Sequence, residues 1–330
     1  MAPAPAAQVP PAAAPAPAPQ ARPAAAAPPA PQAAPAAPAP AGFRFEQVVA
    51  GQMLIETLLA KPAHADPRRL ERYGWKGYSQ TDEDGILQEI FRRIGIAQRS
   101  FVELGCGFGM ENNTAYLLSQ GWRGLWVDGA DENALRIRRA FRYLIEQRLL
   151  QFEQAMITRE NVDALVAAAA LGPEIDLLSI DLDGNDYYVW EAITCVNPRV
   201  VVIEYNAKFH PPHDWCMAYN AAHTWADTDQ MGCSLEALAR LGAARGYVLA
   251  GCNLVGANAF FVRRDLAGEH FATPASAAHL FQPARYYLTT AFYAGHLANS
   301  LTIVEGASLG AGLPWPPQEP VDAMYFEAHG

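Results

Sequence analysis

Short apolar runs alternate with segments of helical periodicity through the middle of the chain. Strand-like runs cover 101–104, 124–127, 150–155, 175–180 and 200–204, and helical patterns cover 112–119, 132–148, 161–170 and 187–193. The run VVVIE at 200–204 is apolar at nearly every position, which is typical of a parallel strand covered on both faces. Alternating strands and helices are joined by right-handed crossovers. The pattern therefore predicts an α/β fold with a doubly wound, mostly parallel sheet.

Other patterns precede and follow this alternation. Apolar residues at mixed three- and four-residue spacing predict amphipathic helices over 43–60 and 84–94. A helix is expected over 234–244, and strands over 247–252 and 259–263 follow it with no helix between them. Such strands are expected to pair antiparallel, so the sheet should have seven strands and end in an antiparallel hairpin. A weak helical pattern covers 286–298.

Residues 1–42 differ in composition from the rest, because 35 of these 42 residues are Pro or Ala and Arg22 is their only charge. Alternating Pro and Ala favour extended, solvated backbone, so we expect a disordered tail. The alternative, a signal peptide, would need a basic start and a Leu-rich run. The expected organisation is a tail (1–42), an N-terminal helical segment (43–98), a main domain (99–265) with an insert loop (207–232), and a C-terminal extension (266–330).

The charge of the chain narrows the class of partner. It carries 24 Lys and Arg against 34 Asp and Glu, for a net charge of −10, which argues against a nucleic-acid partner. No apolar run approaches the roughly 18–20 residues needed to span a bilayer. Five cysteines without a C-x-x-C pair indicate neither a disulfide framework nor a zinc site. We expect a cytoplasmic protein that acts on a small molecule or glycan, with a homo-oligomer compatible with these features.

The strongest local motif, Glu103-Leu-Gly-Cys-Gly-Phe-Gly109, lies between a strand and a helix. Glycines at these positions let the backbone turn sharply and approach a ligand, and the following helix offers its first amides. A dinucleotide site would have G-x-G-x-x-G, whereas the spacing here is G-x-G-x-G. The next strand ends at Asp128, where a carboxylate can accept ribose hydroxyls. The combination predicts an adenosyl site without a pyrophosphate, and the alternative is a tight turn without a ligand.

In this motif and in the acidic end of the second strand, the chain resembles the class I S-adenosylmethionine-dependent methyltransferases. The resemblance extends over about 78–264. More narrowly, YSQTDEDGILQEIF, SIDLDGNDYYVWEAI and VVIEYNA resemble the FkbM-type branch and its bacterial relatives, many of which are associated with O-methylation of sugars or secondary metabolites. The resemblance implies a Rossmann-like fold and methyl transfer to a hydroxyl of a sugar, a glycan or a secondary metabolite.

The resemblance also implies contacts with the cofactor. It places the backbone of 105–107 near the methionine part of S-adenosylmethionine, Glu103 near its amino group and Asp128 at the ribose. Residues 155 and 156 would border the adenine, and the Y-S-Q segment at 78–80 would either fold over the site or cap the 84–94 helix. The expected cofactor-binding residues are Glu103, Gly105, Cys106, Gly107, Gly109, Asp128, Ala155, Met156, Asp181 and Gln80. Of these, Cys106 is read as a small space-filling residue.

Acidic residues follow the fourth and fifth strands, in DLDGND at 181–186 and EYN at 204–206. The carboxyl ends of strands face the ligand crevice of an open α/β sheet, and carboxylates this close repel one another unless a cation or hydrogen-bond donors compensate. Asp181, Asp183, Glu204 and Asn206 thus offer oxygen ligands to Mg²⁺, as in catechol-type methyltransferases, although one residue separates the acid from the amide here. In the alternative without metal, Asp181 contacts the cofactor amine or the substrate and Asp186 caps the next helix.

Methyl transfer to a hydroxyl requires alignment of donor and acceptor and removal of a proton. The candidate bases are His210 and His213, in FHPPHDW after the fifth strand, and Asp183. Loop histidines of this kind are otherwise surface residues. Three aromatic residues of the same loop either pack on the core or form a wall for a sugar ring: Trp215, Tyr219 and Trp225.

Two other function classes remain open at this point. The first is a non-catalytic adenosyl-binding scaffold module of a biosynthetic assembly, recruited through the Pro/Ala tail. The crowd of carboxylates at the expected crevice argues against it. The second is a nucleotide-dependent oxidoreductase, which the glycine spacing disfavours.

Overall fold

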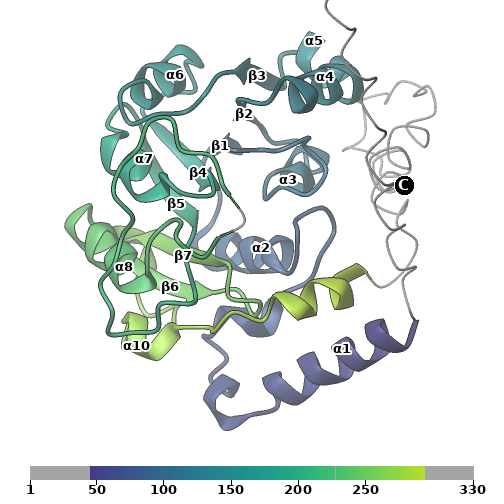
Figure 1. The fold of residues 1–330 in the computed structure, drawn as a ribbon, viewed down its shortest axis with the longest axis vertical. Helices are drawn as coiled ribbons and strands as arrows, with labels where there is room; N and C mark the ends of the chain where they lie inside the picture. Colours follow the sequence, from purple (N-terminus) through teal and green to yellow (C-terminus); the bar gives the residue numbers. More distant parts are fainter. Residues whose placement is uncertain (1–44, 227, 294–330) are drawn as a thin grey trace, which may run out of the picture. The chain divides into compact units, whose positions relative to one another are not determined.

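A seven-stranded sheet forms the centre of the protein, whose computed structural model describes residues 45–226 and 228–293 (Figure 1). The strand order is β3-β2-β1-β4-β5-β7-β6. The strands are β1 (Ser100–Leu104), β2 (Arg123–Asp128), β3 (Leu150–Gln154), β4 (Glu174–Ile180), β5 (Asn197–Glu204), β6 (Tyr247–Cys252) and β7 (Asn258–Arg263). Strands β1 to β5 pair in parallel, and β7 pairs antiparallel with both β5 and β6. The predicted doubly wound α/β fold with an antiparallel terminal hairpin is confirmed.

Two apolar cores lie on opposite faces of the sheet, and β5 contributes to both. Val201 and Ile203 belong to one core, whereas Val200 and Val202 belong to the other. Successive side chains of a strand point to opposite faces, so a strand covered on both sides must be apolar throughout. The first core is closed by α6 (Val162–Ala168), α7 (Asp186–Ala192) and α8 (Leu235–Ala244), and the second by α2 (Glu83–Ile94), α3 (Ala115–Ser119), α4 (Asp131–Ala140) and α5 (Arg142–Glu146).

The helix predicted over 132–148 is two helices, α4 and α5, which meet at Phe141. The Phe141 ring is buried and packs edge-on against Trp126 of β2, with ring centroids 4.7 Å apart. Its backbone leaves helical geometry at φ −106° and ψ 15°. The break between the helices coincides with this tertiary contact, which the periodicity of the sequence cannot predict.

The N-terminal helix α1 (Phe45–Leu59) packs beside the 3₁₀ helix η3 (Tyr286–Tyr293), as Figure 1 shows. Leu58, Leu288 and two residues of the turn between β6 and β7, Leu254 and Val255, form a small apolar cluster there. A helix was predicted over 286–298, and the structure shows that residues 286–293 of this range form a 3₁₀ helix. Residues 294–298 and the predicted tail lie outside the described residues.

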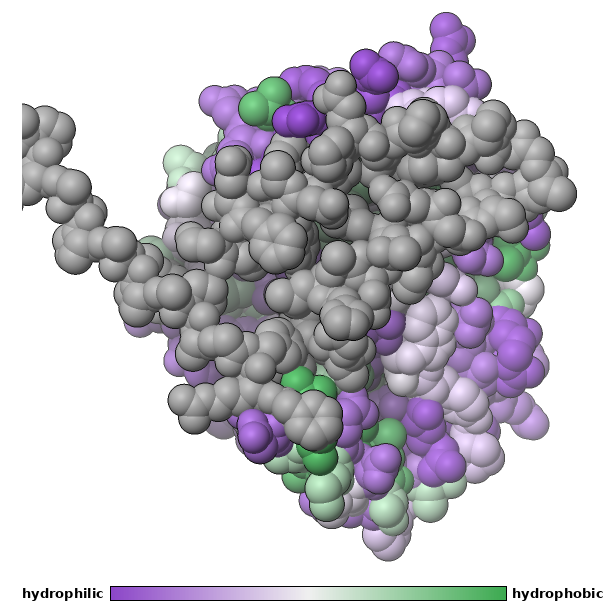
Figure 2. All heavy atoms as spheres, turned by 90° about the vertical axis from the view of Figure 1, so that its right-hand side faces the viewer, coloured by the Kyte–Doolittle hydropathy of each residue, from purple (hydrophilic) through white to green (hydrophobic). Residues whose placement is uncertain are grey.

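Short elements complete the described part of the chain: η1 (Pro62–His64), η2 (Leu70–Tyr73), α9 (Arg264–Ala267) and α10 (Ala277–Leu280). On the face shown in Figure 2, hydrophobic side chains are scattered among hydrophilic ones in the coloured part of the surface. In the part of the chain that the structure describes, no helix combines the length and apolarity needed to cross a bilayer.

Candidate functional site

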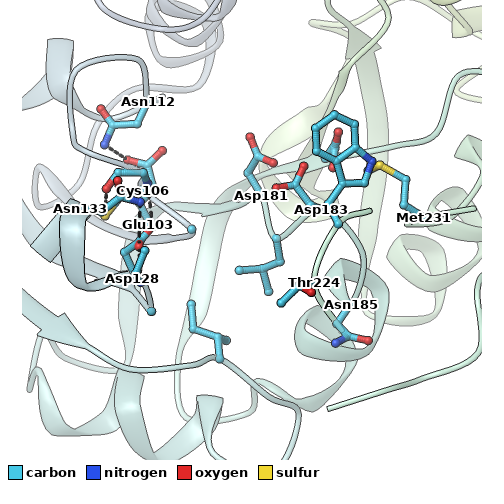
Figure 3. Close-up of a pocket in the computed structure, with 18 of the residues that line it drawn as sticks. Glu103, Cys106, Asn112, Asp128, Asn133, Asp181, Asp183, Asn185, Thr224 and Met231 are labelled. Carbon is cyan, nitrogen blue, oxygen red and sulfur yellow. Dashed lines mark hydrogen bonds between the residues drawn. The ribbon is translucent and has the colours of Figure 1, made fainter. Parts of the chain in front are cut away.

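A cavity of about 730 Å³ lies at the carboxyl ends of β1, β2, β4 and β5. Its walls come from the glycine turn after β1, the residues following β2 and β3, and the loops after β4 and β5. Figure 3 shows Glu103, Asn112 and Asp128 on one side of this space and Asp181 and Asp183 on another. Cavities of this size enclose small-molecule ligands.

The glycine turn fits closely between its neighbouring strands. Gly105 donates its amide to the Val127 carbonyl at 2.9 Å, and its φ of +81° is favourable only for glycine. A Cβ at this position would lie 1.7 Å from the carbonyl oxygen of Asp181. Gly107 also has positive φ (+56°), but a Cβ there would meet no atom within 4 Å. Gly105 is therefore required by the fold, whereas Gly107 leaves open space along the cavity wall that it lines.

Gly109 has a role different from the predicted one. It does not appear among the residues that line the cavity. An added Cβ would lie 2.6 Å from the Trp126 ring and 2.9 Å from the Phe141 ring. Gly109 thus gives two buried aromatic side chains the room they need, and the prediction that it contacts the cofactor does not fit this position.

The Asp128 carboxylate organises the turn from the end of β2. Its Oδ2 accepts a hydrogen bond from the Gly107 amide at 2.9 Å, and its Oδ1 accepts from the Ala130 amide at 2.9 Å and from Asn133 Nδ2 at 3.0 Å. A carboxylate offers roughly four acceptor positions. Three are used within the chain, which leaves capacity for one donor from a ligand in the cavity that Asp128 lines.

Glu103 is almost fully buried at the base of the cavity, and residues of the segment after the glycine turn surround it. Its oxygens accept hydrogen bonds from Asn112 Nδ2 (2.8 Å), the Asn113 amide (2.8 Å) and Thr114 Oγ1. Burial raises the pKa of Glu103 to about 7, and these hydrogen bonds oppose the rise. The three donors also explain why α3 begins only at Ala115 and not at 112 as predicted.

Asn112 is a cavity residue that the sequence analysis did not single out. Its Nδ2 points to Glu103 (Figure 3), whereas its Oδ1 is buried and has no hydrogen-bond partner within the described residues. Glu103 was expected beside the cofactor amino group, and the structure adds Asn112 to the same wall. The sequence feature that could have indicated Asn112 is ENNT at 111–114. These polar residues directly follow the glycine turn, where a helix was expected to begin.

The remaining cofactor residues predicted from the resemblance line the same cavity. Ala155 and Met156 follow β3, with Met156 53% exposed, and Gln80 and Cys106 line the cavity as well. The segment before Gln80 is held by Asp84, whose Oδ2 accepts hydrogen bonds from the amides of Gly77, Tyr78 and Ser79 at 2.6–2.9 Å. The Ser79 hydroxyl in turn accepts from the Asp84 amide. The Y-S-Q segment therefore both reaches the cavity and anchors the start of α2.

Three carboxylates converge on the opposite side. Oxygens of Asp181, Asp183 and Glu204 lie within 4.8 Å of one another. Burial and the neighbouring Asp186 and Asp183 carboxylates raise the pKa of Asp181 far above its usual range, and burial together with Asp181 does the same for Glu204. Glu204 Oε2 is buried without a hydrogen-bond partner, and no Lys or Arg among the described residues lines the cavity. The group is therefore one that a proton or a cation would stabilise.

Asn206, the fourth predicted metal ligand, is otherwise engaged. Its Nδ2 donates to the carbonyls of Asp229 (2.8 Å) and Met231 (3.0 Å), and its Oδ1 accepts from the Lys208 amide (3.1 Å). Asn206 lines the cavity, but its amide fixes the loop after β5. The metal-ligand group that the structure brings within 4.8 Å consists of the three carboxylates, and Asn206 lies beside it with one lone pair of its Oδ1 engaged.

Asp186 stabilises the turn before α7. Its Oδ1 accepts from the Leu182 amide at 2.9 Å and its Oδ2 from the Gly184 amide at 3.0 Å. It is the first residue of α7, so it holds the preceding turn and is not the N-cap residue. Within this turn Asp183 adopts φ +53°, which is unusual for a residue with a side chain.

The two predicted histidine bases do not line the cavity. His210 packs against Phe281, with ring centroids 4.8 Å apart, and His213 is exposed. His223, further along the same loop, is the histidine of the described residues that lines the cavity. One of its ring nitrogens, Nε2, lies 3.0 Å from the carbonyl oxygen of Asp183. His210 and His213 thus lie outside this cavity although they follow β5 more closely in the sequence than His223 does.

Of the three loop residues considered for an aromatic wall, Trp225 lines the cavity, whereas Trp215 and Tyr219 do not. Trp215 stacks on Phe209 at 4.1 Å, and Tyr219 bonds to Glu160 and lies under Arg159. Trp225 is 52% exposed and lines the cavity, as does Tyr286 of η3. The other two aromatic rings pack within the loop or on its surroundings, which was the alternative interpretation.

The chain was compared with protein families, curated proteins and solved structures. No protein-family model matches the chain, and no curated protein is significantly similar to it. Among solved structures, it is similar to an O-methyltransferase from Bacillus cereus in complex with SAH (13% identity, 50% of this chain and 68% of that one, TM-score 0.28). It is also similar to an S-adenosylmethionine-dependent methyltransferase from Clostridium acetobutylicum (11%, 64% and 98%, 0.34) and an O-methyltransferase family protein from Burkholderia thailandensis (12%, 66% and 71%, 0.31). All three TM-scores are below 0.5.

Proposed function

We propose that this protein is an S-adenosylmethionine-dependent methyltransferase that acts on a hydroxyl of a sugar, a glycan or a secondary metabolite. One observation carries the proposal. The glycine turn and Asp128, which suit an adenosyl cofactor, line the same cavity as Asp183 and His223, which suit removal of a proton. A turn without a ligand would not require a second set of polar groups in the same space.

The residues present fit the cofactor at three points. Open space beside Gly107 allows a ligand to approach the backbone, Asp128 retains capacity for one ribose hydroxyl, and Met156 presents an exposed apolar side chain for the adenine. When bound, S-adenosylmethionine supplies the electrophilic methyl group. The chain's own contribution is to hold the donor in this orientation and to exclude water from the space between donor and acceptor.

Asp183 and His223 are the proposed groups that take the hydroxyl proton. Partial desolvation in the cavity wall raises the pKa of Asp183, and the nearby His223 opposes this rise. A carboxylate with a raised pKa is a stronger base than one at its ordinary pKa. Trp225 offers a flat apolar surface in the same part of the cavity for a sugar or phenolic ring. His210 and His213, which lie elsewhere on the loop, are not assigned to the reaction.

A divalent cation is a further part of the proposal. Asp181, Asp183 and Glu204 present hard oxygen ligands within 4.8 Å of one another, and the unpartnered Glu204 oxygen agrees with a positive ligand. Mg²⁺ bound there would lower the pKa of an acceptor hydroxyl, and because it would occupy the Asp183 carboxylate, His223 would then be the group that takes the proton. Titration of the protein with Mg²⁺ in a calorimeter, with Asp183→Asn as the comparison, tests this part separately from cofactor binding.

The experiment that tests the proposed activity is transfer of a labelled methyl group. The protein is incubated with methyl-labelled S-adenosylmethionine and mixtures of sugars, nucleotide sugars and phenolic compounds, and products are separated by mass. Label in a product, transferred more slowly by Asp128→Ala at a limiting concentration of the cofactor, supports the methyltransferase. Binding of the cofactor without transfer to any acceptor favours the scaffold module, and binding of NAD(H) in its place favours the oxidoreductase.

A further inference from the structure

The loop after β5 is closed at its base by a short antiparallel contact between Cys216 and Cys233. The Met217 amide donates to the Gly232 carbonyl at 3.0 Å, and the Ser234 amide donates to the Trp215 carbonyl at 2.8 Å. These two bonds flank the cysteine pair. The pair is therefore of the non-hydrogen-bonded type, in which opposite Cα atoms approach to about 4.5 Å and the side chains share one face.

This geometry suits a disulfide. A disulfide requires Cα atoms roughly 4.4–6.8 Å apart and side chains that point toward each other. The neighbouring Cys233 thiol lowers the pKa of Cys216. Cys216 is half-buried, whereas Cys233 is fully buried in the core. Cys216 is thus the thiol that a reagent reaches first, and Cys233 is the thiol placed to resolve the product.

We propose that Cys216 and Cys233 are an oxidisable dithiol site whose disulfide locks the loop that forms one wall of the cavity. With glutathione disulfide as the oxidant, the Cys216 thiolate attacks one sulfur and releases one glutathione thiolate. The Cys233 thiol then loses its proton, attacks Cys216 and releases the second glutathione. The two cysteines together lose two electrons and two protons, and the oxidant becomes two glutathione thiols.

The position of the pair gives the disulfide a consequence at the cavity. Between the two cysteines lie six residues that line it: His223, Thr224, Trp225, Thr228, Asp229 and Met231. In the reduced chain this segment is held by hydrogen bonds such as those from Asn206 to the Asp229 and Met231 carbonyls. A covalent bond at the base restricts the loop further, because it removes the open conformations that separate its two ends. This inference does not depend on the identity of the reaction.

The test begins with equilibration of the whole protein in glutathione buffers of increasing potential, followed by quenching with an alkylating reagent. Tryptic peptide 209–240 contains both cysteines, because no Lys or Arg lies within it before Arg240. The expected result is a peptide lighter by two hydrogens, whose halves stay joined after cleavage before Asp229. Alkylation of both thiols in every buffer, or a stable glutathione adduct on Cys216 alone, overturns the proposal.

Two variants make the assignment specific. Cys216→Ser is expected to abolish the cross-link. Cys195→Ser, which removes another half-buried thiol, is the matched control and should leave it unchanged. Oxidation should slow hydrogen exchange of amides 218–231 in the unsubstituted protein and in Cys195→Ser. It should not slow their exchange in Cys216→Ser. Unchanged exchange in the oxidised protein would refute the locking of the loop.

Discussion

The Asp128 carboxylate accepts a hydrogen bond from the backbone amide of Gly107, with Oδ2 2.9 Å from the nitrogen. This bond joins the end of β2 to the glycine turn that follows β1. The two features that the sequence analysis combined into one adenosyl site are therefore a single unit in the structure. A change at either residue alters the position of the other, so effects on stability and on binding must be measured separately.

The glycines of the turn differ in what an added methyl group does. Gly105→Ala would place a Cβ 1.7 Å from the Asp181 carbonyl oxygen and is expected to reduce the free energy of unfolding by more than the roughly 1–2 kcal/mol of left-handed strain alone. Gly107→Ala meets no atom within 4 Å, so it should cost only about that strain. It should nevertheless weaken binding of S-adenosylhomocysteine, because the methyl group occupies the cavity wall. Denaturant unfolding and calorimetry separate the two effects. Equal losses of stability in the two variants would contradict this account of the turn.

Glu103 makes the stability of the protein depend on pH. Its pKa in the folded protein is about 7, against an ordinary value of 4.5. A raised pKa of an acid means that the folded state binds the proton more tightly than the unfolded state. The contribution of Glu103 is therefore fully present below pH 4.5 and is lost as pH rises through 7. Urea unfolding of the parent and of Glu103→Gln at several pH values should show a smaller decline for the variant over this range. The same decline in both would assign the pH dependence to other buried carboxylates.

His223 and His210 offer a matched pair for the proposed reaction. His223 lines the cavity with Nε2 3.0 Å from the Asp183 carbonyl, whereas His210 packs on Phe281 outside it. With an acceptor identified by label transfer, His223→Ala should lower turnover by about a hundredfold, in the range typical of general acid-base groups. His210→Ala should leave turnover within a factor of a few. A larger loss of turnover in His210→Ala than in His223→Ala would instead favour His210, the histidine nearer to β5 in the sequence, as the base.

The fold was predictable because its signals are local. Alternating segments, an all-apolar β5 and two strands without an intervening helix follow directly from burial on one or both faces of a sheet. The exceptions have tertiary causes. The break at Phe141 accompanies its packing on Trp126, and the late start of α3 depends on three donors that turn toward Glu103.

The candidate site was predictable where residues adjoin strand ends. Asp128, Asp181 and Glu204 are placed by the sheet itself, so their convergence on one cavity follows from the strand order. The loop after β5 has no such constraint. Its path is set by contacts distant in sequence, such as Asn206 with the Asp229 carbonyl, and these bring His223 to the cavity instead of His210 or His213.

Calorimetric titration with S-adenosylhomocysteine measures directly whether this cavity binds an adenosyl cofactor. The parent protein should bind one equivalent, and Asp128→Ala should bind about ten- to a hundredfold more weakly, as expected for loss of a hydrogen bond to a charged group. Asp131→Ala, which removes an exposed carboxylate three residues away, is the control and should bind like the parent. Absence of binding by a folded parent, or equal affinity of the parent and Asp128→Ala, would contradict the account.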